Sequence, residues 1–140
     1  MKKGRGFEPN VSARTGKVVR GAGVVMPVFL LIYGLFVHAG VVSAEHYFSL
    51  AALYVICIAW FFIALYQFFA PAKRRRDTLI YLGLHHLFAI AYIWLVSGFD
   101  MPFISCWIVL FYASYAYFGR NGLIGSIFAL FVASFGDMLI

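Results

Sequence analysis

The sequence contains few charged residues, and they are almost absent from its long apolar segments. Charged residues make up 11% of the 140-residue chain, whereas hydrophobic residues make up 64% and the mean hydropathy is +0.93. A soluble globular domain is about 25% charged and about 45–50% apolar, and such a fold could not cover this much apolar surface. The composition therefore predicts an integral membrane protein.

The sequence also lacks the motifs of several enzyme and transporter classes. It contains no glycine-rich phosphate loop, no Gly-x-Ser-x-Gly and no paired carboxylates inside an apolar segment. No Lys or Arg lies inside these segments, which argues against retinal attachment and against a voltage sensor. No Glu lies there either, although small multidrug exporters need one. We therefore expect no catalytic residue and no enzyme activity in this segment.

Metal and cofactor sites are also not expected. The two cysteines, Cys57 and Cys106, are too far apart for a Cys-x-x-Cys site and lie inside apolar segments, where a disulfide is not expected. A bis-histidine haem would need His38 and His85 at one depth. At about 1.5 Å per residue they lie roughly 25 Å and 10 Å from the same membrane face. We predict neither metal nor haem.

Five apolar segments have the length of a membrane-spanning helix. About 20 residues cross roughly 30 Å of hydrocarbon as a helix, and the period-2 alternation of a barrel strand is missing. The sequence thus predicts an all-α, polytopic helical membrane bundle over residues 21–140, with short connections between antiparallel neighbours. The predicted spans are 21–44, 47–70, 78–97, 101–119 and 121–140.

The basic residues predict the orientation of this bundle. They fall before the first span, in the loop Lys73–Arg76 and at Arg120, which share one side if five spans are present. The positive-inside rule places that side, with the N-terminus, in the cytoplasm. Residues 1–20 are predicted to be a flexible basic arm on anionic lipid head groups, and no nucleic-acid partner is expected. We expect a multi-pass protein of the bacterial cytoplasmic membrane.

The last predicted span ends at Ile140 without a flanking charge or polar tail. The last helix of a membrane protein usually carries residues that mark the interface. We therefore interpret the sequence as an N-terminal membrane domain of a longer chain or as a truncated gene product. The alternative is a five-helix protein that ends at the membrane surface.

One polar cluster is predicted inside the bundle. His85 and Tyr92 share a face of the third span, and Tyr112 and Tyr115 share a face of the fourth. Tyr115 lies at about the depth of His85, roughly 9–10 Å from the cytoplasmic side. These four residues form either an interhelical hydrogen bond or a ligand-binding pocket for a lipophilic molecule such as a quinone. The adjacent His86 is expected to serve packing or a backbone contact.

A stripe of small residues marks the fifth span. Gly125, Ala129 and Ala133 follow one another at intervals of four, which suits close packing of helices. The stripe is interpreted as a packing face within the bundle or as the seam of a homodimer.

The segments "FFAPAKRRRDTLIYLG" and "FYASYAYFGRNGLIGSIFALFVASFGD" follow a basic arm and long apolar spans. This layout resembles the N-terminal multi-helix sensor domains of bacterial signalling proteins, both the MASE2-like domains ahead of diguanylate cyclases and the input domains of histidine kinases. The chain lacks the tryptophan-proline pattern that follows the second helix of MASE2 domains, so no ligand residue is carried over.

The resemblance implies a sensory input domain of a signal-transduction protein, which senses a lipophilic or membrane-state signal as a homodimer. Two alternatives stay open. One is a small structural or accessory subunit of a membrane complex, and the other is a small transporter.

Overall fold

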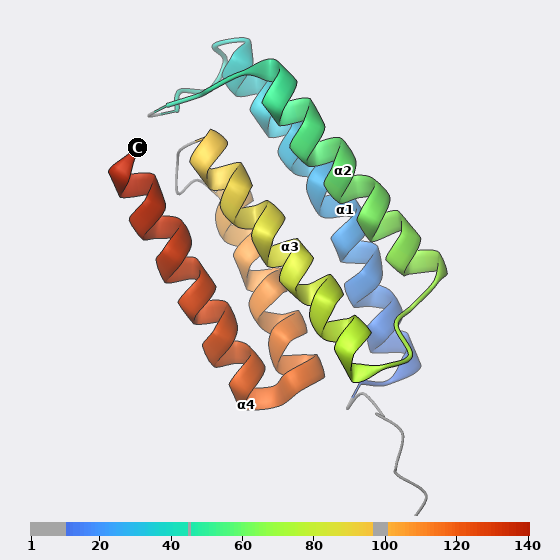
Figure 1. The fold of residues 1–140 in the computed structure, drawn as a ribbon. Coiled ribbons are helices and arrows are strands. Elements are labelled where there is room, and N and C mark those ends of the chain that lie inside the picture. The colour runs from blue at the N-terminus through green and yellow to red at the C-terminus, as the bar shows by residue number, and fades with distance from the viewer. Residues whose placement is uncertain (1–10, 45, 97–100) are drawn as a thin grey trace, which may run out of the picture.

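A computed structural model of the chain describes residues 11–44, 46–96 and 101–140, and these form an all-helical bundle (Figure 1). Each of its four helical elements is long and apolar enough to cross a membrane. They are α1 (Ala13–His38), α2 (Leu50–Phe69), α3 (Arg75–Leu95) and α4 (Met101–Leu139).

Helix α4 contains both of the last two predicted spans, so the predicted count of five is corrected to four helical elements. Its backbone leaves helical geometry at Gly119, where φ is 63° and ψ is −145°. A positive φ suits glycine, which has no Cβ, and the chain folds back there into two arms (Figure 1). The reversal is tight, because a Cβ on Gly122 would collide with the backbone oxygen of Ser114. The sequence predicted a one-residue connection at Arg120, and the structure places the turn one residue earlier, at Gly119.

Helices α2, α3 and α4 begin and end within a few residues of the predicted spans, but α1 differs at both of its ends. It ends at His38, before the predicted end at residue 44. Helix α1 begins at Ala13 rather than at Gly21. Its start is capped by Ser12, whose Oγ accepts a hydrogen bond from the Thr15 amide at 3.1 Å. The basic stretch that was predicted to be a flexible arm is therefore helical from Ala13 onward.

The helices pack as two pairs. Helix α1 packs mainly against α2, and α3 packs mainly against α4. The core contains the fully buried Leu30, Leu53 and Ile93, with Trp60 and Tyr92 almost fully buried. Many large apolar side chains on the outside are exposed, as expected for a surface that faces lipid.

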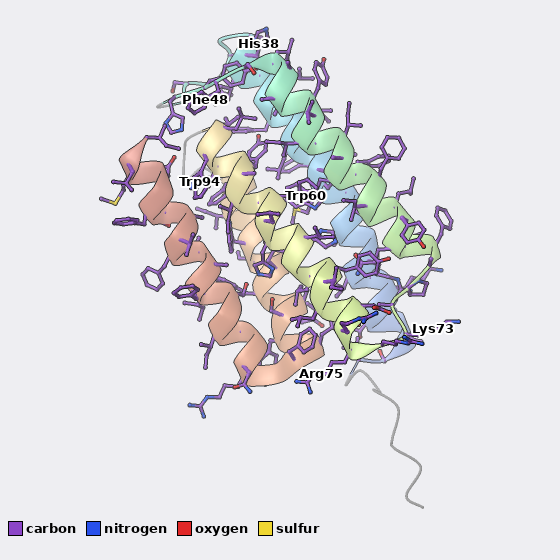
Figure 2. All side chains as sticks on the ribbon, in the orientation of Figure 1. His38, Phe48, Trp60, Lys73, Arg75 and Trp94 are labelled. Atoms are coloured by element: carbon purple, nitrogen blue, oxygen red, sulfur yellow. The ribbon has the colours of Figure 1, made fainter. Side chains whose placement is uncertain are left out.

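The basic end of the bundle is the end that carries Lys73 and Arg75, and the distal end carries His38 and Phe48 (Figure 2). At the distal end, the connection between α1 and α2 meets the end of α3 through an isolated antiparallel bridge from Tyr47 to Val96. His46 lies there too, with Nε2 3.1 Å from the Trp94 carbonyl oxygen.

Candidate functional site

His85 is held by two side chains of α2. The Trp60 indole Nε1 donates to His85 Nδ1 at 2.7 Å, and His85 Nε2 lies 2.8 Å from Gln67 Oε1. An indole N–H can only donate, so Nδ1 is an acceptor. The proton of the neutral ring therefore sits on Nε2 and is donated to the Gln67 carbonyl. Both ring nitrogens are satisfied in a site that is largely buried.

His86 points toward α4 and adopts the opposite tautomer. Its Nδ1 lies 2.7 Å from the Leu82 carbonyl oxygen, and its Nε2 lies 2.6 Å from Ser126 Oγ. A carbonyl can only accept, so the proton sits on Nδ1 and the Ser126 hydroxyl donates to Nε2. The ring also meets Trp107 edge-on, with centroids 5.8 Å apart. His86 thus connects α3 with both arms of α4.

The large cavity lies between α3 and the two arms of α4, next to His86. It has a volume of about 410 Å³, within the range of roughly 300–1,000 Å³ that is typical of small-molecule sites. Most of its wall is apolar, with Arg75, His86, Asn121 and Ser126 as polar groups. Ser114 also lines it, is fully buried, and has no hydrogen-bond partner for Oγ among the residues that the structure describes.

Two glycines leave the large cavity open. A Cβ on Gly83 or on Gly125 would meet no atom within 4 Å, and both residues line the cavity. Gly125 belongs to the stripe of small residues that was predicted for helix packing, but it faces this open space. Further along that stripe, Ala129 packs against the core and Ala133 is fully buried. The Ala133 carbonyl accepts a hydrogen bond from Trp94 Nε1 at 3.0 Å.

The small cavity lies on the other side of α3, where all four helices meet. It has a volume of about 40 Å³, and its wall includes Trp60, Gln67 and His85. One water needs about 10–15 Å³ by this measure, so the space suits a few waters rather than an organic ligand. Pro27 has no N–H, and it therefore removes the helical donor for the carbonyl of Gly23, another residue of this wall.

The basic-end cavity adjoins the small cavity and has a volume of about 110 Å³. The two share the four polar residues Arg20, Gln67, Thr78 and Tyr117. The basic-end cavity continues to Ser12 and Pro71, at the end of the bundle where α1 begins and α2 ends. Together the two cavities extend from the basic end toward His85, and these four polar residues line both of them.

The structure does not bring the four predicted ligand residues together. His85 and Tyr92 are buried, but Tyr112 and Tyr115 are 55% and 58% exposed. The reason is how the helices are rotated about their axes. His85 bonds to α2 and lines the small cavity beside the first arm of α4, whereas Tyr112 and Tyr115 lie on an exposed face of that arm. Tyr92 donates its hydroxyl to the Leu30 carbonyl at 2.7 Å. Ligand binding by His85 stays a prediction.

Sequence reasoning missed the partners of the two histidines. Gln67 is the one amide side chain in a long apolar run, which was a usable signal of an intramembrane hydrogen bond. The hydrogen bond of Trp60 could not be predicted, because an aromatic residue in a membrane span is expected to pack in the core or to contact lipid. Ser126 is 40 residues away from His86 in the sequence, and only the fold of α4 places them together.

The other groups considered in the sequence lie at the distal end or in the core, and of these Cys106 lines the small cavity. The His46 Nε2 lies 3.6 Å from an Asp137 carboxylate oxygen at the distal end. The His38 ring packs against Tyr47. Cys57 and Cys106 are buried free thiols. Among the residues described, no three His, Cys, Asp or Glu side chains come together as a metal site.

Comparison of the chain with protein-family models, with curated proteins and with solved structures finds no match. Any assignment of function therefore rests on the helices, the cavities and the side chains that line them.

Proposed function

We propose that this chain is a membrane-embedded sensory input domain of a bacterial signalling protein, which binds a lipophilic small molecule in the large cavity. The observation that carries the proposal is the cavity of about 410 Å³ between α3 and the two arms of α4. It combines a mostly apolar wall with a few polar groups, the usual composition of a site for an organic ligand. In this proposal His86, Ser114 and Ser126 are the polar contacts.

The position of the cavity supports a signalling role. An occupant would touch α3 and both arms of α4 beside the His86–Ser126 hydrogen bond. The opposite face of α3 is bonded to α2 through His85. A ligand that moves α3 relative to α4 would therefore also act on the contact between the two helix pairs. In a homodimer, such a shift would change how two bundles pack and so reach an output module.

The test fills the cavity without removing any hydrogen bond. Gly83→Leu and Gly125→Leu each place a side chain in the open space. Leu also has a higher helix propensity than Gly by up to about 1 kcal/mol, so we expect both variants to fold. The matched control is Ala51→Leu, which adds the same side chain to an exposed position on α2.

The probe is decylubiquinone, titrated into the protein in nanodiscs of neutral lipid while tryptophan fluorescence is recorded. Trp107 contacts His86, so a quinone in the cavity would quench it. We expect saturable quenching in the natural protein and in Ala51→Leu, and only the weak, linear quenching of a lipid-dissolved quinone in the two glycine variants. Equal saturable quenching in all four proteins would contradict a ligand site in this cavity.

A further inference from the structure

Arg20 differs from the other basic residues near the basic end. Arg14, Lys17 and Arg74 are exposed to solvent or head groups, whereas Arg20 is only partly exposed. Its Nε atom is buried and has no hydrogen-bond partner among the described residues. A guanidinium group stays charged at any ordinary pH, and removing a charge from water is costly unless an opposite charge or hydrogen bonds compensate it. The buried Nε–H of Arg20 therefore needs an acceptor.

The residues around Arg20 supply hydrogen-bond donors but no acid. A Cβ on Gly16 would lie 3.3 Å from Arg20 Nη1 and 3.5 Å from the Tyr117 hydroxyl, so both polar groups lie against this glycine. Gln67 also lines the space, and because its carbonyl binds His85, its NH₂ group is the part left for another acceptor. No Asp or Glu occurs among the described residues that line the small or the basic-end cavity.

We propose that the basic-end cavity binds an oxyanion, a phosphate or carboxylate group, between Arg20 and Tyr117. The anion would supply the negative charge that the described residues lining the two cavities do not provide, and Arg recognises such groups through charge-assisted hydrogen bonds. The cavity of about 110 Å³ holds several waters at the roughly 10–15 Å³ that one water needs by this measure, enough for such a group. The site is separate from the large cavity and does not depend on the proposed sensory ligand.

The anion can come from a free ion or from a lipid head group, since the cavity reaches the basic end near the start of α1. The experiment separates these sources. The protein is placed in phosphatidylcholine nanodiscs, and inorganic phosphate is titrated against sodium chloride of equal ionic strength. In a second arm, phosphatidylglycerol replaces part of the phosphatidylcholine in phosphate-free buffer. Calorimetry gives the Kd of phosphate, and thermal unfolding gives the Tm in both arms.

The variants are Arg20→Gln and its control Arg14→Gln, which removes the same charge from an exposed position on the same helix. We expect phosphate, phosphatidylglycerol or both to raise the Tm of the natural protein and of Arg14→Gln, but not of Arg20→Gln. If phosphate binds, Arg20→Gln should weaken its Kd about tenfold or more, the loss expected for a hydrogen bond to a charged group. A response to phosphate identifies a free-anion site, and a response to phosphatidylglycerol alone identifies a head-group site.

The proposal is overturned if neither anion raises the Tm of the natural protein, or if Arg20→Gln responds as Arg14→Gln does. Without anion, Arg20→Gln should unfold at the same or a higher temperature than the natural protein, because it removes an uncompensated charge. If Arg20→Gln does not fold, Tyr117→Phe provides the test. It keeps the charge and removes one donor, and an unchanged response to anion in that variant would refute the proposed binding position.

Discussion

The hydrogen bond between Trp60 and His85 can be measured by a double-mutant cycle. The changes are Trp60→Phe and His85→Leu, alone and together. Trp60 is 1% exposed, and its Nε1 lies 2.7 Å from His85 Nδ1, so removing the histidine leaves a buried donor unpaired. Loss of His85 also removes the 2.8 Å bond to Gln67. An orphaned buried polar group costs about 1–3 kcal/mol. Interhelical bonds in membranes average about 0.6 kcal/mol and reach about 1.7 kcal/mol.

We therefore expect His85→Leu to lower the free energy of unfolding by about 1–3 kcal/mol. The coupling energy between the two positions should be about 0.6–1.7 kcal/mol, the range for one such bond. The assay is reversible unfolding in mixed micelles, followed by far-UV circular dichroism so that the loss of Trp60 does not change the signal.

The control cycle replaces His85→Leu by His86→Leu. His86 is the next residue along the chain, but its ring bonds to Leu82 and Ser126 rather than to Trp60. Its coupling with Trp60→Phe should therefore be close to zero. A coupling energy below about 0.3 kcal/mol for His85, or one of equal size for His86, would refute the assignment of the two rings to opposite sides of α3.

Two further predictions use the same unfolding assay. Gly34→Ala would place a Cβ 2.6 Å from Cδ1 of the fully buried Leu53. It should therefore destabilise the protein by about 1–3 kcal/mol, although Ala has the better helix propensity. A gain in stability would show that α1 and α2 are less closely packed. Tyr92→Phe removes the buried hydroxyl that donates to the Leu30 carbonyl and should cost about 0.6–1.7 kcal/mol. Its control, Tyr115→Phe, removes an exposed hydroxyl and should change the stability by less than about 0.5 kcal/mol. Equal effects of the two tyrosine variants would contradict this placement of the rings.

The helical, membrane-spanning character of the fold could be predicted because it depends on properties that are local in the sequence. Runs of about 20 apolar residues between basic clusters specify helices of that length. The start of α1 could not be placed in the same way, because Ser12 caps a helix whose first turns are still polar. The merging of the last two spans depends on the backbone of a single glycine, Gly119, whose positive φ makes a turn without a loop.

The candidate sites were harder to predict, because they depend on how each helix is rotated about its axis. Spacing placed His85 and Tyr92 on one face of α3, and both are buried. That face of α3 meets both α2 and the first arm of α4, but spacing and depth could not decide which face of this arm turns inward, and Tyr112 and Tyr115 lie on its exposed face. Arg20, whose Nε has no hydrogen-bond partner among the described residues, could not be told from the surface charges, since the sequence does not show which basic side chain turns inward.

The divergence of the two adjacent histidines has a consequence for how α3 can move. The helical turn from Leu82 to His86 lines both the small and the large cavity. The His85 ring bonds this turn to α2, and the His86 ring bonds it to α4. A rotation of α3 about its own axis would lengthen the Trp60–His85 and His86–Ser126 hydrogen bonds at the same time. The two adjacent histidines therefore hold α3 in one rotational orientation relative to α2 and α4. A screw-like motion of α3 must break both hydrogen bonds, whereas a tilt of α3 about this turn can keep both.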